Sequence, residues 1–139
     1  MPSKYIFDTG FLILALIEDL PEKWKLPWRE VKLGRKLCYI IEPVLMETAY
    51  QLMRRGFNKD KTKDIIIKLK SLKSVKIVKL DDNDAMESAI LHTRFKLSFV
   101  DCILLSIAKR YRLKIFTTDA PLKNIARKLN VDVNHLPIH

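Results

Sequence analysis

The chain has 139 residues, a hydrophobic fraction of 48% and a formal net charge of +10 at pH 7. This is the usual length of one domain, so we expect residues 1–139 to form a single domain with a packed core. No apolar run approaches the ~20 residues that a membrane-spanning helix needs, and acidic residues interrupt the apolar stretch near the N-terminus. The composition therefore predicts a cytoplasmic protein that does not associate with membranes.

The positive charge is concentrated in one segment. Residues 54–79 hold ten Lys and Arg residues against two Asp, a net charge of +8, whereas the rest of the chain carries only +2. A basic segment on a compact domain is typical of a surface that binds a polyanion. A solvated lysine-rich face of the kind found in heat-adapted proteins would look the same. Charge alone leaves both interpretations open.

Several cofactor classes are disfavoured by composition. Cys38 and Cys102 both lie in apolar stretches, which favours two buried structural thiols. The three histidines have no metal-ligand spacing, so a zinc site is not expected. With three glycines and no GxGxxG or GxxxxGK[ST] motif, the sequence also disfavours dinucleotide and P-loop nucleotide binding.

Strand-like and helix-like patterns alternate along the chain. In the first half we expect, in order, a strand at 4–7, a helix at 9–18, a mixed segment with a short helix at 21–36, a strand at 38–41, and helices at 43–55 and 59–72. In the second half we expect a strand at 75–80, helices at 82–95 and 98–111, a strand at 114–117, a helix at 120–129 and a strand at 131–133. Strands separated by helices predict an α/β fold, a three-layer α/β/α sandwich with a central parallel sheet of about five strands.

Four acidic residues follow or begin these elements. Asp8 and Asp119 come directly after predicted strands, while Glu47 and Asp101 lie in the first turns of predicted helices. In an open parallel sheet, ligands bind beyond the carboxyl ends of the strands, near a reversal in strand order. We therefore expect all four carboxylates to point toward one rim of the sheet.

Each acid also has a purely structural explanation. Asp8 and Asp119 suit helix N-caps, Ser98 and Asp101 form an S-x-x-D pair like a capping box, and Glu47 fits an exposed helix position. Their joint placement at one rim is what favours a functional site. Clustered carboxylates repel one another by about 3 kcal/mol per pair at ~5 Å separation. A divalent cation that prefers oxygen ligands, Mg²⁺ or Mn²⁺, would relieve this repulsion and promote phosphodiester hydrolysis.

Three segments carry a resemblance to a known family: YIFDTGFLI, IEPVLMETAYQLMRR and LSFVDCILLSIAKRYRLKIFTTD. In this order they resemble the motifs of the PIN-domain nucleases, and of their short VapC-type toxins in particular. The resemblance covers essentially the whole chain and implies a sheet in which the first and fourth strands are neighbours. It implies a metal-dependent endoribonuclease that cleaves RNA, the toxin of a type II toxin–antitoxin pair.

The resemblance also implies residue roles. Asp8, Asp101 and Asp119 match direct or water-mediated metal ligands, and Glu47 matches an acid that binds the metal through water or orients the attacking water. Thr117, and less clearly Thr9, match residues that support the acids by hydrogen bonding. Two positions depart from the family pattern: Gly10 stands where Asn is frequent, and Cys102 where Ala is frequent.

The sequence also bears on partners and on alternative functions. The resemblance implies an antitoxin protein that occludes the site, and a homodimer. Trp24 and Trp28, which lie among basic residues, favour anchoring to the core over stacking on RNA bases. A receiver-type phosphorelay domain would need an acidic neighbour beside Asp8 and a lysine after the last strand, and both are missing. A PIN-like module that binds RNA or assembles without catalysis is the stronger alternative.

Overall fold

A computed structural model describes residues 4–138, which form one five-stranded parallel sheet with seven α-helices and a short 3₁₀ helix. The strands are β1 (Lys4–Phe7), β2 (Leu37–Ile41), β3 (Val75–Val78), β4 (Lys114–Thr117) and β5 (Val133–His135). Their order across the sheet is β3-β2-β1-β4-β5, and all four pairings are parallel. The predicted α/β sandwich around a sheet of about five strands is therefore confirmed.

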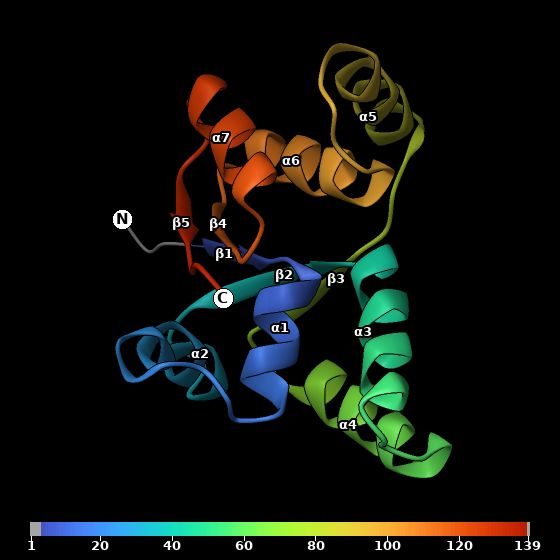
Figure 1. Cartoon of the computed structure of the whole chain (residues 1–139), viewed down its shortest axis with the longest axis vertical. Helices are drawn as coiled ribbons and strands as arrows, with labels where there is room; N and C mark the ends of the chain where they lie inside the picture. Colours follow the sequence, from blue (N-terminus) through green and yellow to red (C-terminus); the bar gives the residue numbers. More distant parts are fainter. Residues whose placement is uncertain (1–3, 139) are drawn as a thin grey trace.

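Helices cover both faces of this sheet (Figure 1). One side carries α1 (Thr9–Leu16), α2 (Lys25–Lys32), α3 (Glu42–Arg54) and α4 (Lys59–Ser71), with the 3₁₀ helix Glu22–Trp24 leading into α2. The other side carries α5 (Asp82–Arg94), α6 (Phe99–Tyr111) and α7 (Ala120–Lys128). Among the residues described, no helix is both long enough and apolar enough to cross a membrane.

The strand order reverses between β1 and β4. The chain steps outward from β1 to β2 and β3, then crosses to the other side of β1 to form β4 and β5. Ile6 pairs with Ile115 and Phe7 with Phe116, so the two strands end level with each other. The segments that follow them, which hold Asp8 and Thr118, therefore emerge side by side at the reversal point, where parallel sheets place their ligands.

An aromatic cluster fills the core beneath this point. The rings of Phe7, Phe11 and Phe116 are all buried, with centroids 4.7 to 5.5 Å apart. Trp24 packs edge-on against Phe11 at 6.3 Å, and Trp28 lies in the same core at 9% exposure. Both tryptophans thus anchor the first helices to the core, as the sequence favours. Cys38 and Cys102 are buried free thiols, also as expected.

Three predicted elements have bounds that are wrong by two residues. The strand expected at 75–80 ends at Val78, since residues 79 and 80 lead into the Asp81 cap of α5. The first helix ends at Leu16 rather than residue 18, because Glu18 has a φ of 59°, outside the right-handed helical region. The last strand is Val133–His135 rather than 131–133. Asn130 is left-handed, with a φ of 58°, and the N–H of Val131 donates to the Ala126 carbonyl at 2.9 Å, so these residues terminate α7.

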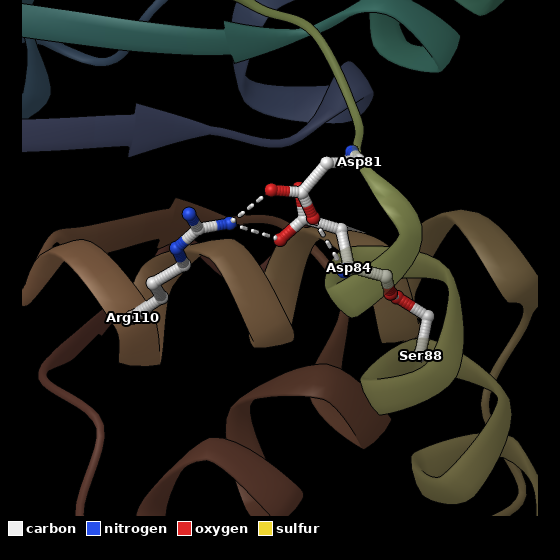
Figure 2. Close-up of polar contacts among 4 residues, drawn as sticks. All are labelled: Asp81, Asp84, Ser88 and Arg110. Atoms are coloured by element: carbon white, nitrogen blue, oxygen red, sulfur yellow. Dashed lines mark hydrogen bonds and ion pairs between the residues drawn. The ribbon is translucent and has the colours of Figure 1, made fainter.

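A polar cluster joins α5 to α6 on the far side of the sheet (Figure 2). Asp81 caps α5 by accepting from the Asp84 N–H, and the Asp84 carboxylate accepts from the Asp81 N–H in return. Arg110 of α6 donates to Asp84 at 2.8 Å and to Asp81 at 3.3 Å. Asp84 is only 2% exposed. The cost of burying its charge is offset by this guanidinium and by the helix N-terminus.

Candidate active site

Asp8 occupies the turn between β1 and α1, directly at the reversal in strand order. One oxygen of its carboxylate accepts from the Phe11 N–H at 2.8 Å, which makes Asp8 the N-cap of α1. The other oxygen accepts from the Thr117 hydroxyl and from the Thr118 N–H, the latter at 3.2 Å. With 6% exposure, this carboxylate is held in a fixed orientation at the end of the sheet.

Asp119 reaches the same place from β4. It caps α7 by accepting from the Leu122 N–H at 3.2 Å, and its own N–H donates to the Thr117 hydroxyl oxygen at 2.9 Å. The fully buried hydroxyl of Thr117 therefore bonds to both aspartates at once, as donor to Asp8 and as acceptor from the Asp119 backbone.

Asp101 enters the cluster from the first turn of α6. Ser98 caps this helix by accepting from the Asp101 N–H at 3.1 Å. The Asp101 side chain lies beside the Asp119 carboxylate and within electrostatic range of Asp8. Three aspartates separated by up to 111 positions in the sequence thus share one rim.

The cluster is electrostatically unfavourable as it stands. The pKa of Asp101 is raised to about 7, first by burial and then by the neighbouring carboxylates of Asp119 and Asp8. Burial also raises the pKa of Asp8 to about 6, although its hydrogen bonds to Thr117, Phe11 and Thr118 act in the opposite sense. At neutral pH the folded chain therefore holds negative charge that is only partly compensated by the chain itself.

Glu47 does not share the hydrogen bonds of the aspartates. It lies on α3 and accepts from the Thr9 hydroxyl at 2.6 Å, with its carboxylate exposed to solvent. Thr9 directly follows Asp8, so Glu47 reaches the rim of the cluster through this threonine. The sequence predicts all four acids at one rim, and the structure brings three together with the fourth attached from the side.

The donor set suits Mg²⁺ or Mn²⁺. Within residues 4–138, no three Asp, Glu, His or Cys side chains already stand at the spacing needed to ligate one ion. Mg²⁺ does not require such a cage, because it is usually held by one or two carboxylates and keeps several waters. Two carboxyl groups with raised pKa values, facing a third, are hard oxygen donors whose repulsion a divalent cation would offset.

Thr118 is a neighbour of the site that the sequence does not single out. A Cβ atom added to Gly10 would collide with the Thr118 hydroxyl oxygen, so Thr118 fills the space that a side chain at position 10 would need. In the sequence, Gly10 stands where the resembled motif often has Asn. The absence of that side chain is the one hint that another residue, here Thr118, fills the space. The partner that fills the space becomes visible only once β1 and β4 are paired.

A cavity of about 410 Å³ opens beside the cluster, between α1 and α3. It is lined by Thr9, Gly10, Ile13, Glu47, Tyr50, Gln51 and Arg55. Thr9 and Glu47 thus border both the cavity and the acid cluster. Sequence reasoning misses this cavity, because the residues of α1 and α3 that line it meet only through tertiary packing.

Solved structures of toxin–antitoxin systems share this fold. A toxin–antitoxin complex from Klebsiella pneumoniae superposes with a TM-score of 0.70 at 18% identity, over 97% of this chain and 100% of that chain. VapBC2 from Rickettsia felis, bound to a promoter DNA fragment, gives 0.71 at 15% identity, over 95% and 98%. VapC20 from Mycobacterium tuberculosis, a toxin that cleaves the sarcin–ricin loop, gives 0.70 at 17% identity, over 88% and 95%.

Sequence comparison gives the family. No curated protein is a significant match to the chain. Residues 5–128, however, match the PIN domain, whose members are typically nucleases and generally use divalent metals. This match extends from β1 to the end of α7 and includes all four acids of the rim. The chain therefore belongs to the PIN-domain family.

Proposed function

We propose that this chain is a divalent-metal-dependent endoribonuclease and the toxin of a toxin–antitoxin pair. The observation that carries the proposal is the convergence of Asp8, Asp101 and Asp119 at the strand-order reversal, with raised pKa values at Asp8 and Asp101. A site that folds at the expense of such repulsion is suited to a cationic ligand. Membership of the PIN family and the fold of the toxin structures support the same assignment.

In this proposal Asp8, Asp101 and Asp119 hold Mg²⁺ or Mn²⁺, directly or through water. The bound ion would stabilise charge on a phosphoryl oxygen and make a nearby water more acidic. Thr117 fixes the geometry of the acids, because its hydroxyl bonds to Asp8 and to the Asp119 backbone. Glu47, oriented by Thr9, would orient the attacking water and accept its proton. The water oxygen bonds to phosphorus, the P–O bond to the ribose oxygen breaks, and that oxygen takes a proton from solvent.

An antitoxin would have a suitable groove on the α1–α4 side of the molecule. A cavity of about 500 Å³ lies between α1, α2 and α4, with apolar walls from Leu16, Ile17, Trp28, Phe57, Ile65, Leu69 and Leu72. Its charged lining residues are Lys32, Lys61 and Lys68, with Glu18 as a single acidic residue, so its net charge is positive. Apolar walls with a net positive charge fit an acidic amphipathic segment. The similar structures from Klebsiella pneumoniae and Rickettsia felis are themselves toxin–antitoxin assemblies.

The test of the nuclease assignment is Asp8→Asn. Asn keeps the side-chain shape and one oxygen for the α1 cap. It removes a negative charge and puts an amide nitrogen in place of the oxygen that accepts from Thr117 and Thr118. We expect cleavage of single-stranded RNA in Mn²⁺ to fall by at least about a hundredfold, while RNA binding persists. Stabilisation of the parent by Mn²⁺, about 2.7 kcal/mol at a hundredfold excess over Kd, should shrink in the variant.

The matched control is Asp64→Asn, which makes the same change at an exposed position on α4. This variant should retain the parent's cleavage rate and Mn²⁺ response. Full activity in purified Asp8→Asn protein would refute the assignment. A parent that binds RNA but never cleaves it, with or without Mn²⁺, would identify the catalytically silent module instead.

A further inference from the structure

The cavity between α1 and α3 has a polar lining of which the proposed chemistry uses only Glu47. Glu47, Gln51 and Arg55 lie at successive four-residue intervals along α3 and its C-cap, so they share one face of the helix. This face extends about 12 Å along the helix, from Glu47 beside the acid cluster to Arg55 at the C-terminal end of α3. Along it the charge changes from negative to positive.

The residues of this cavity suit the parts of a single nucleotide. Tyr50, with 56% of its surface exposed, offers an aromatic ring for stacking, and the Gln51 amide can both donate to and accept from a base edge. Arg55 forms no ion pair with any residue between 4 and 138, which leaves its guanidinium available for a phosphate. The Arg54 guanidinium, 5.8 Å from the Tyr50 ring centroid, adds a second cation.

The opposite wall leaves room for a ligand. Gly10 has no side chain, and Ile13 is 2% exposed and contributes an apolar floor. At about 410 Å³ the cavity falls within the size range of small-molecule sites. An apolar floor, an aromatic ring and convergent polar groups form the combination that recognises unstacked bases of single-stranded RNA.

We propose that this cavity binds one unpaired nucleotide of the RNA substrate, next to the phosphate that is cleaved. The base stacks on Tyr50 and contacts Gln51, and Arg55 pairs with a backbone phosphate. Because Thr9 and Glu47 border both the cavity and the acid cluster, the bound nucleotide sets which phosphodiester bond reaches the acids. This proposal names the substrate subsite of the proposed ribonuclease and rests on that function.

A second copy of the chain is the competing occupant of this face. Met46, Tyr50 and Met53 are exposed at 73, 56 and 45%, and their spacing gives an apolar stripe on α3 beside the cavity. A dimer interface would bury this stripe together with the tyrosine ring. The nucleotide is favoured for the cavity itself, because Glu47, Gln51 and Arg55 are polar groups that an apolar interface would have to desolvate.

The experiment is an abasic scan of a short single-stranded RNA, read as binding affinity. The Asp8→Asn protein binds a set of RNAs in which each nucleotide in turn lacks its base, and the scan is repeated with Tyr50→Leu added. At one position, loss of the base should weaken binding about tenfold when the tyrosine is present. The effect should be much smaller in the Tyr50→Leu protein, where only the Gln51 contact to the base remains. Tyr50→Phe should keep the position-specific loss, since it retains the ring.

The matched control is Tyr111→Leu, which removes an exposed tyrosine from α6, outside the cavity. It should leave the abasic scan as in the parent background. Should Asp8→Asn fail to fold, the parent protein in chelator replaces it in the same scan. A scan that is unchanged by Tyr50→Leu would overturn the subsite. So would a Tyr50→Leu protein that loses only dimerisation, measured by light scattering, because the ring would then belong to an interface between copies.

These outcomes are independent of the nuclease test, because the scan measures binding without cleavage. Normal Mn²⁺-dependent cleavage together with a scan insensitive to Tyr50 would refute the subsite alone. A Tyr50-dependent scan in a parent protein that never cleaves RNA would refute the nuclease function and leave the subsite standing. A tenfold change corresponds to about 1.4 kcal/mol, well within the range measured by titration.

Discussion

The Thr117 hydroxyl fixes the positions of two aspartates of the acid cluster relative to each other. It is fully buried, and it uses its donor for Asp8 and its acceptor for the Asp119 backbone. A valine of similar size would leave both partners short of a hydrogen bond inside the protein, which lowers the free energy of unfolding and disturbs the geometry. The threonine thus stabilises this rim whether or not a metal is bound.

The contact between Gly10 and Thr118 gives a prediction on stability. Gly10→Ala should place a methyl group against the Thr118 hydroxyl and lower the free energy of unfolding by about 1–3 kcal/mol, as overpacking usually does. In a Thr118→Ala background the same change should be neutral or slightly stabilising, because Ala favours a helix over Gly. Urea unfolding of the parent, both single variants and the double variant measures this coupling.

The double-mutant cycle also shows what would contradict this prediction. If the two substitutions add within about 0.5 kcal/mol, residues 10 and 118 do not share the space that the structure gives them. Gly34→Ala is not a suitable control because its φ is 76°, so a side chain there is strained for a different reason. Ala89→Gly, at an exposed position inside α5, reports the cost of helix propensity without a packing contact.

Among the secondary-structure elements, the N-termini of three helices bring the aspartates to the site. Asp8 caps α1, Asp119 caps α7, and Asp101 lies in the first turn of α6. Capping and metal binding are therefore compatible roles for these carboxylates, although the sequence presents them as alternatives. The positive ends of three helix dipoles offset part of the charge that the cluster accumulates.

The elements can be predicted from the sequence to a large extent, since their signals are local. Strand Lys4–Phe7 is predicted with its observed bounds, and Ser98 is the residue expected to open α6 and observed to cap it. The resemblance places β4 beside β1, which the structure confirms. The Thr118 contact and the cavity beside α3 cannot be predicted, because both depend on how distant segments pack together.

The polar cluster between α5 and α6 is another feature that depends on tertiary packing and cannot be predicted from local sequence. Arg110 lies 26 positions after Asp84, and the two meet only because α5 and α6 pack against each other (Figure 2). The sequence predicts a helix at 82–95 that begins in an acidic turn. It gives no sign that Asp84 is the buried member of that turn, because three residues there are equally acidic and only tertiary contact distinguishes them.

Replacing Asp84 tests this junction. Asp84→Ala should lower the free energy of unfolding by about 1–3 kcal/mol, because it removes half of the capping box and the carboxylate that Arg110 contacts. Asp82→Ala removes the same charge from the same turn at an exposed position and should cost no more than about 0.5 kcal/mol. Equal losses in the two variants, measured by urea unfolding, would contradict the structural role of Asp84.

Across the whole molecule, α3 connects the acid cluster to the basic segment. Its first turns carry Glu47 at the rim, and its C-terminal end leads into α4, which holds five of the ten Lys and Arg residues between positions 54 and 79 (Figure 1). An RNA strand that passes Tyr50 and Arg55 on its way from the acids would therefore reach α4 next. The basic segment that stands out in the sequence thus lies at the end of a continuous path from the proposed site.

Neutralising three lysines of α4 tests that path. Lys61, Lys63 and Lys68 are exposed, and lysine acts on RNA as a point charge that contacts phosphates rather than bases. Replacing all three by Gln should weaken binding to every single-stranded RNA by a similar factor. It should also flatten the slope of log affinity against log salt concentration by up to about 2, since each single-strand phosphate contact contributes about 0.7.

The control for this prediction is a second triple variant that has the same net charge but carries its substitutions elsewhere on the molecule. Lys96, Lys109 and Lys128 are also exposed, but they belong to the α5–α7 side of the sheet, so their replacement by Gln lowers the charge by the same three units away from the path. Affinities of both triple variants for one RNA, measured by fluorescence anisotropy between about 50 and 200 mM salt, separate the effect of local contacts from that of overall charge. If RNA follows α3 to α4, only the first variant flattens the slope. Equal slopes in the two variants would mean that the net charge of +10 attracts RNA without a defined track. Lys61 and Lys68 would then act only as lining residues of the apolar groove between α1, α2 and α4.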